Sequence, residues 1–93
     1  MWEIYEHQSL TKKLSRLPLE VLKRYEKWKD IVYISGSEGL RLIKGLRDES
    51  LKGQWQGHRS SRLGLQYRAI YSVEKGKIYV QVLSITPHDY RRK

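Results

Sequence analysis

The chain has 93 residues, a formal net charge of +9 and no cysteine. This length predicts one domain over residues 1–93, and the lack of cysteine excludes disulfides and thiolate metal sites. No apolar run approaches the ~20 residues of a membrane span, and the acidic N-terminus is unlike a signal peptide. These features fit a cytoplasmic protein without a membrane partner.

Positive charge is concentrated in the second half of the chain. Residues 1–50 hold ten Lys and Arg against eight Asp and Glu, whereas residues 51–93 hold nine against two. A basic half on a small domain predicts a polyanionic partner, with nucleic acid as the first candidate. Surplus charge for solubility and a surface for an acidic protein are the alternatives.

The chain begins with a predicted strand and a short helix. Residues 2–5 alternate apolar and polar side chains, as a strand does. Ser9 suits a helix N-cap, and leucines follow it at helical spacing, at positions 10, 14 and 17. Pro18 then ends this helix and suits the first turn of the next one.

The second helix is predicted over residues 18–34, with an apolar stripe on one face and charges on the other. Gly36 stops it, and Ser37 is expected to cap a short third helix. Residues 48–50 are expected to form a polar turn. The two main helices cannot bury both stripes against each other alone, so they are expected to lie on a sheet.

Three further strands are predicted, over residues 57–63, 65–73 and 77–85. Gly76 supplies the hairpin turn between the last two. The expected fold is therefore α+β: an N-terminal strand, a helical hairpin and a three-stranded antiparallel meander. Together they form one twisted sheet with the helices packed on one face.

Arg68 is a cation on the less apolar face of a strand expected to be central. Leucine, tyrosine, alanine and valine alternate with it on the other face of residues 65–73. A strand holds a side chain more rigidly than a loop, which suits a group that must meet a phosphate. A solvated residue on an open sheet face is the alternative.

The chemistry-bearing residues suit RNA cleavage without a metal or a cofactor, because no metal-ligand spacing and no phosphate-cradling glycine loop is present. RNA supplies its own nucleophile, the 2′-OH; an enzyme adds a base, a cation for the phosphate and an acid. Glu49 could be the base, Arg68 the phosphate clamp and His88 the acid, while Tyr90 could stack on a base. The alternatives are a solvated carboxylate at Glu49 and a loose tail at His88 and Tyr90.

Residues 49–90 resemble the RelE/YoeB toxins of bacterial toxin–antitoxin operons, within the RelE/ParE superfamily. The order of strand, two helices and three strands agrees with the RelE-like two-layer fold. The motifs that carry the resemblance are Glu49-Ser50-Leu51-Lys52-Gly53, Gly57, Ser61-Arg62, Tyr67-Arg68-Ala69-Ile70-Tyr71 and His88-Asp89-Tyr90.

The resemblance implies a metal-independent, ribosome-dependent mRNA endonuclease that inhibits translation. Such a protein enters the A site of the 70S ribosome, contacts rRNA and cuts mRNA through 2′-OH attack on the scissile phosphate. A cognate antitoxin neutralises it, and it meets operator DNA only through the antitoxin complex. By position, Glu49 matches the general base, Arg68 the phosphate-binding arginine, and His88 with Tyr90 the C-terminal acid and aromatic residue.

Further contacts to RNA and the ribosome are expected from a set of basic and polar residues: Lys52, His58, Arg59, Arg62, Asp89, Arg91 and Arg92. The chain departs from the family pattern because it lacks the RelE lysine pair and places Asp89 between His88 and Tyr90. Which of these last three is the acid stays open. The alternatives are a ParE-like toxin that poisons DNA gyrase without cleaving nucleic acid, and a basic nucleic-acid-binding module.

Overall fold

The computed structural model of the chain describes residues 1–64 and 66–84. Five strands form one sheet in the order β1-β5-β4-β3-β2. The pairs β2–β3, β3–β4 and β4–β5 are antiparallel, whereas β1 pairs with β5 in parallel. Their bounds are β1 Glu3–Glu6, β2 Glu49–Ser50, β3 Arg59–Arg62, β4 Arg68–Glu74 and β5 Lys77–Ser84.

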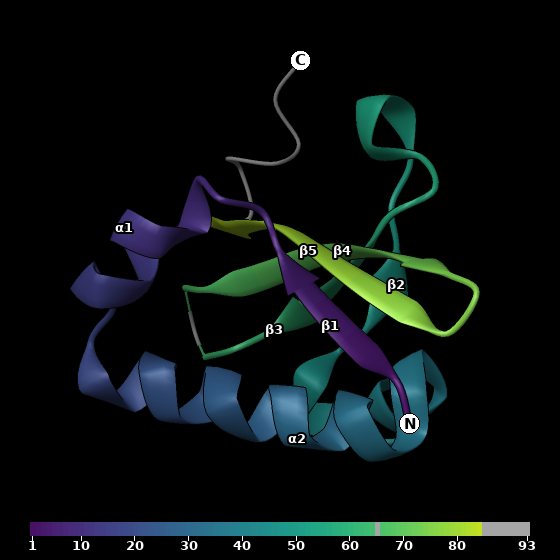
Figure 1. Cartoon of the computed structure of the whole chain (residues 1–93), viewed down its shortest axis with the longest axis horizontal. Helices are drawn as coiled ribbons and strands as arrows, with labels where there is room; N and C mark the ends of the chain where they lie inside the picture. Colours follow the sequence, from purple (N-terminus) through teal and green to yellow (C-terminus); the bar gives the residue numbers. More distant parts are fainter. Residues whose placement is uncertain (65, 85–93) are drawn as a thin grey trace.

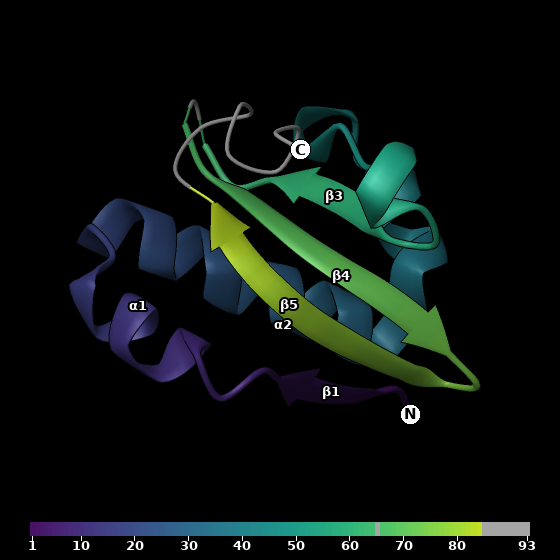
Figure 2. The same ribbon diagram turned by 90° about the horizontal axis from the view of Figure 1, so that it is seen from above.

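Helix α2 (Leu19–Arg41) covers one face of the sheet, and α1 (Leu10–Arg16) lies at its side, in contact with β5 (Figure 1). Seen from above, after a turn of 90° about the horizontal axis, the strands lie in front of α2 (Figure 2). Short 3-10 turns, η1 (Lys44–Leu46) and η2 (Gly53–Trp55), lie in the connections that flank β2. The two-layer α+β fold predicted from the sequence is confirmed. No helix among the described residues is long and apolar enough to cross a membrane.

Helix α2 continues to Arg41, beyond the predicted end at residue 34. Gly36 does interrupt it, with φ 67° and ψ −163°, but the chain resumes helical geometry at once. The predicted third helix is therefore the continuation of α2 past a kink. A Cβ at Gly36 would fall inside the indole of Trp2, so the close approach of the N-terminal segment requires glycine here.

Ser9 stands at the N-cap position of α1, as predicted, but its side chain makes no capping hydrogen bond. The hydroxyl lies 2.8 Å from Nδ1 of His7 instead. The backbone of Ser9 is already helical, with φ −64° and ψ −14°, and this differs from the extended geometry of a capping serine.

The sheet holds one strand more than the sequence predicts. Residues 49–50, expected to lie in a polar turn, form β2 and pair with Ser60 and Arg59 of β3. β3 begins at Arg59 rather than at Gly57, because the chain up to Gly57 is used by the η2 turn. β4 begins at Arg68 rather than at residue 65. The antiparallel part therefore has four strands.

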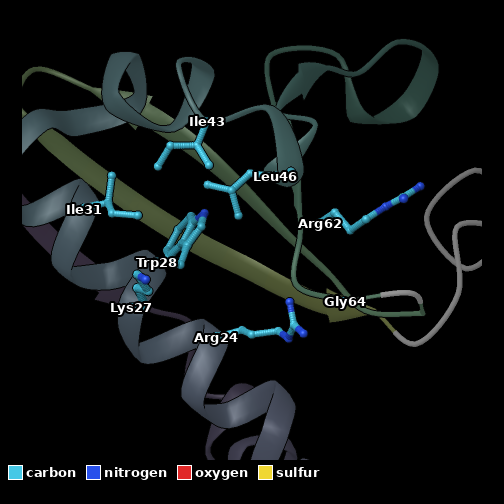
Figure 3. A pocket seen from close by; sticks show the side chains of 9 residues that line it. Arg24, Lys27, Trp28, Ile31, Ile43, Leu46, Arg62 and Gly64 are labelled. Atoms are coloured by element: carbon cyan, nitrogen blue, oxygen red, sulfur yellow. The ribbon is translucent and has the colours of Figure 1, made fainter.

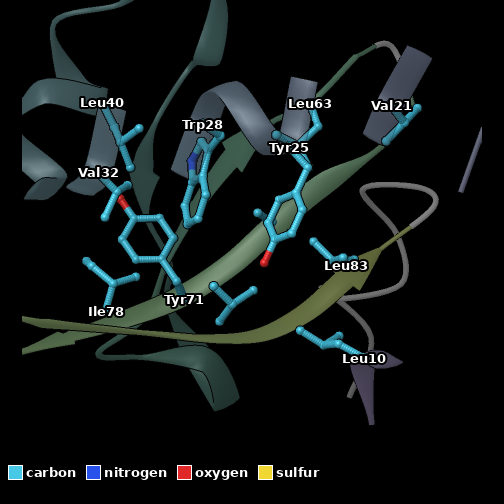
Figure 4. Close-up of a cluster of buried hydrophobic side chains, with 12 residues drawn as sticks. Leu10, Val21, Tyr25, Trp28, Val32, Leu40, Leu63, Tyr71, Ile78 and Leu83 are labelled. Carbon is cyan, nitrogen blue, oxygen red and sulfur yellow. The ribbon is translucent and has the colours of Figure 1, made fainter. Parts of the chain in front are cut away.

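The core lies between the sheet and α2 and is centred on three aromatic rings (Figure 4). Trp28 meets Tyr71 of β4 edge-on at 5.4 Å between centroids, and it stacks on Tyr25 at 5.7 Å. All three are at most 1% exposed. Rings of this size bury roughly 150–250 Å² each, so they dominate the apolar contribution to stability.

A hollow of about 480 Å³ remains where α2, η1 and β3 meet; it is called the α2 hollow below (Figure 3). It lies on the helix side of the sheet. Its lining combines an apolar floor with cations, and no acidic side chain of the described residues contributes to it. The floor is formed by Trp28, Ile31, Ile43 and Leu46, and the cations are Arg24, Lys27 and Arg62.

Candidate functional site

Three polar side chains from neighbouring strands meet on the face of the sheet that is turned away from the helices. Glu49 of β2 is paired with Ser60 of β3, and opposite residues of an antiparallel pair point to the same face. Arg68 of β4 reaches the same place: its Nη1 donates to Ser60 Oγ at 3.3 Å and lies 3.9 Å from a carboxylate oxygen of Glu49.

The pair combines a fixed cation with an accessible carboxylate. The side chain of Arg68 is 9% exposed, whereas that of Glu49 is 49% exposed. At 3.9 Å the two groups form an ion pair without a close hydrogen bond. A carboxylate open to solvent can accept a proton from a substrate, and a guanidinium held by its neighbours can stabilise a developing negative charge.

The segment between β2 and β3 rises on the same side of the sheet, opposite α2 (Figure 1). It carries Lys52, which is exposed, and His58, which is half-buried. The His58 ring meets Trp55 edge-on at 5.1 Å. The Leu51 N–H donates to the His58 carbonyl at 2.9 Å and closes the base of the segment. The segment that carries both predicted RNA contacts therefore lies on the side of the sheet that holds Glu49 and Arg68.

A second polar cluster, around Asp48, lies on the helix face. The Asp48 side chain is fully buried and accepts hydrogen bonds from Arg59 Nε at 2.6 Å, from Ser61 Oγ at 2.6 Å and from the Tyr71 hydroxyl. Burial, together with the hydrogen bond to the Asp48 carboxylate, raises the pKa of Tyr71 well above its usual range. Burial lowers the pKa of Arg59, but the bond and charge of Asp48 outweigh this and raise it.

The structure separates the two arginines of β3 that were predicted to bind RNA. Arg59 is engaged by Asp48 on the helix face and does not join Glu49 and Arg68. Arg62 is paired in register with Arg68 and also lines the α2 hollow. Figure 3 shows its side chain extending away from Trp28, toward the edge of the hollow.

The predicted C-terminal residues His88, Asp89, Tyr90, Arg91 and Arg92 lie outside the described residues. Arg68 at the start of β4 is paired with Ser84, the last residue of β5. Within residues 1–64 and 66–84, no three His, Cys, Asp or Glu side chains are grouped so that they could hold a metal ion.

No protein-family model matches the sequence, and no curated protein is significantly similar to it. Solved structures match over nearly the whole chain. The archaeal RelE–RelB complex from Pyrococcus horikoshii OT3 has 25% identity and a TM-score of 0.73, covering 92% of this chain and 96% of that one. The chain has the fold of the RelE toxins.

Two other RelE-like structures show the same fold at lower identity. YafQ from Escherichia coli strain BL21(DE3) has 15% identity and a TM-score of 0.75, with 97% of this chain and 98% of that chain covered. The YoeB–YefM complex from Staphylococcus aureus has 16% identity and a TM-score of 0.71, with 90% and 95% covered. The resemblance predicted from the sequence is confirmed.

Within this RelE-like fold, sequence reasoning missed Asp48. It is the most enclosed carboxylate of the polar clusters described above, and it joins β3 and β4 to the start of β2. No motif or spacing singles it out, because its three donors come from positions 11, 13 and 23 residues away. The available signal was an acidic residue directly before the predicted base.

Proposed function

We propose that the chain is the toxin of a toxin–antitoxin pair and acts as a ribosome-dependent mRNA endonuclease in the cytoplasm. The observation that carries this proposal is the meeting of Glu49 and Arg68 at 3.9 Å on one face of the sheet. The RelE fold and the basic second half of the chain, with nine Lys and Arg against two Asp and Glu, support it.

In the proposed reaction Glu49 takes the proton from the 2′-OH of the RNA, and the hydroxyl oxygen attacks the adjacent phosphorus. The bond from phosphorus to the 5′-oxygen breaks, leaving a 2′,3′-cyclic phosphate, and an acid protonates the departing oxygen. Arg68 stabilises the extra negative charge on the phosphate in the transition state. His88, Asp89 and Tyr90 are the candidates for the acid.

The ion pair between Glu49 and Arg68 in the protein without RNA affects the proposed reaction. A phosphate that binds Arg68 carries a full negative charge and competes with Glu49 for the guanidinium. Substrate binding would therefore free the Glu49 carboxylate to act as a base at the moment it is needed. Ser60, which accepts a hydrogen bond from Arg68 at 3.3 Å, keeps the guanidinium in place during the exchange.

Binding of the RNA would rest on cations around this pair. Lys52 and His58 lie on the segment that rises beside it, and Arg62 stands next to Arg68 in the sheet. We expect these side chains, with Arg91 and Arg92, to contact phosphates of mRNA and rRNA in the 70S ribosome. Because phosphate contacts release counterions, binding should weaken as salt rises.

The proposed protein partner is a cognate antitoxin, through which alone the toxin would meet operator DNA. One matched structure is a YoeB–YefM toxin–antitoxin complex, which supports such a partner. We propose that an acidic amphipathic segment of the antitoxin docks in the α2 hollow. Its apolar side chains would cover Trp28 and Ile31, and its carboxylates would face Lys27 and Arg24.

The test is to express the wild type and the Arg68→Ala and Glu49→Gln variants without an antitoxin and to map mRNA 3′ ends on ribosomes. We expect the wild type to stop growth and to produce new ends at A-site codons, and both variants to lose these effects while melting as cooperatively as the wild type. Arg41→Ala, which removes an exposed arginine at the end of α2, is the control and should stay toxic. Intact mRNA with DNA damage would favour the gyrase-poison alternative.

A further inference from the structure

We propose that Asp48 is a positioning residue, which holds the backbone of β2 so that Glu49 meets Arg68. This inference rests on the proposed role of Glu49 as the base. Asp48 faces the helices and Glu49 faces away from them, so the two consecutive carboxylates lie on opposite sides of the sheet. A tether on one of them therefore fixes the direction of the other.

Strand β2 needs such a tether because it is too short to hold its own place. It has two residues, stands at the edge of the sheet and pairs with β3 through Glu49 and Ser50 alone. Isolated short pairings of this kind are marginal in water. The half-exposed Glu49 side chain adds little packing, so its position depends on what holds the chain on either side.

Asp48 supplies that hold through two strands at once. Arg59 and Ser61 of β3 and Tyr71 of β4 all donate to its carboxylate, and the side chain is closed off from water. Charge-assisted hydrogen bonds to a buried carboxylate are short and strong. The cluster thus ties the start of β2 to the two strands that carry Ser60 and Arg68.

The backbone before Asp48 shows that this segment is constrained. Arg47 has φ 44° and ψ 49°, a left-handed conformation that a side chain with a Cβ rarely adopts. Such a conformation persists where the surrounding structure over-determines it. The Asp48 cluster, directly after the left-handed residue, is the contact that can impose it.

Substitution of Asp48 should slow RNA cleavage by displacing Glu49. Losing the tether would let β2 shift, and a displacement of about 1 Å of a reacting group can cost roughly 100-fold in rate. Binding of RNA by Lys52, Arg62 and Arg68 would be retained. Substitution of Asp48 should therefore lower kcat and leave KM nearly unchanged.

The test is single-turnover and steady-state cleavage by the full chain on programmed ribosomes. The variants are Asp48→Asn, Glu49→Gln, the double variant and Asp30→Asn as an exposed control on α2. We expect Asp48→Asn to lower kcat about 10–100-fold, Asp30→Asn to behave as wild type, and the double variant to match Glu49→Gln alone. Independent, multiplicative effects of the two substitutions, or a change in KM alone, would overturn the positioning role.

The tether can also be tested by a measurement that does not depend on RNA cleavage. Amide hydrogen exchange should rise at residues 49–51 in Asp48→Asn and stay unchanged at residues 78–80 in the core. Tyr71→Phe removes one donor, keeps the ring, and should show the same pattern more weakly if Asp48→Asn fails to fold. If the wild type does not cleave RNA, the proposed function fails, while unchanged exchange at residues 49–51 would still refute the tether.

Discussion

Glu49 and Arg68 belong to strands that do not pair with each other, yet a Glu49 carboxylate oxygen lies 3.9 Å from Arg68 Nη1. The strand between them, β3, contributes Ser60, whose hydroxyl accepts from the same guanidinium nitrogen. The site is therefore a product of sheet order: β2 and β4 must flank β3, in register, for Glu49 and Arg68 to meet.

The two arginines of β3 should behave differently when they are removed. Arg59→Ala leaves the enclosed Asp48 carboxylate without its cation, so we expect the free energy of unfolding to fall by about 3 kcal/mol. Arg62→Ala should leave stability within about 0.5 kcal/mol and weaken ribosome binding, with a smaller dependence on salt. Denaturant titration and binding at several salt concentrations measure both. Equal loss of stability in the two variants would contradict the assignment of Arg59 to the Asp48 cluster.

Stability should fall in alkaline solution because of Tyr25 and Tyr71. Burial, with the neighbouring Glu6 and Asp48 carboxylates as hydrogen-bond partners, raises both pKa values above the ordinary value near 10. Above that pH the unfolded state loses the tyrosine protons while the folded state keeps them, so the unfolded state binds fewer protons and stability declines as pH rises. The stability that the two protonated tyrosines contribute is fully present below pH ~10. Unfolding curves between pH 8 and 11 measure the slope, which should be smaller in Tyr71→Phe; an identical slope would contradict the prediction.

Gly36→Ala should destabilise the domain more than Gly45→Ala does. The new Cβ would collide with the Trp2 ring, and the positive φ would be strained, for a combined loss of roughly 1–3 kcal/mol. Gly45→Ala is the matched control, because a Cβ there would meet no atom within 4 Å. Thermal melting compares the two variants. A Gly36→Ala protein as stable as Gly45→Ala would show that the kink in α2 is not needed.

Charge reversal at the α2 hollow should weaken neutralisation by the antitoxin without reducing toxicity. Lys27→Glu places a negative charge among the cations that line the hollow, whereas Lys23→Glu makes the same change on an exposed part of the same helix. We expect antitoxin affinity to drop about tenfold or more for Lys27→Glu alone, since like charges across an interface are costly. Calorimetry with the co-expressed antitoxin measures this. Equal affinities of both variants would place the antitoxin elsewhere.

Local patterns predicted most of the fold. Alternation in residues 65–73 placed Arg68 on the face opposite Tyr71, and the leucine and aromatic stripes located both helices. Gly36 was expected to stop the helix, but it only kinks it, and glycine does not indicate that helical geometry resumes after it. That outcome depends on Leu40, which is completely buried in the core and holds the last turn against it.

The parts that the sequence did not predict depend on distant partners. Residues 49–50 are polar and short, and they form a strand because β3 offers a free edge. Arg59 was expected to bind RNA because it is basic, but its direction follows from its register opposite Tyr71 and from Asp48. Charge composition cannot distinguish a cation that faces a ligand from one that neutralises a buried carboxylate.

The parallel pairing of β1 with β5 joins residues 3–6 to residues 77–80, so the two strands at one side of the sheet are separated by nearly all of the described chain. Contacts between such distant segments slow folding, because a long loop must close before they form. During translation, β1 has no partner until β5 has been synthesised. The nascent chain therefore cannot complete its sheet early, and this delays the appearance of the folded domain on the ribosome that makes it.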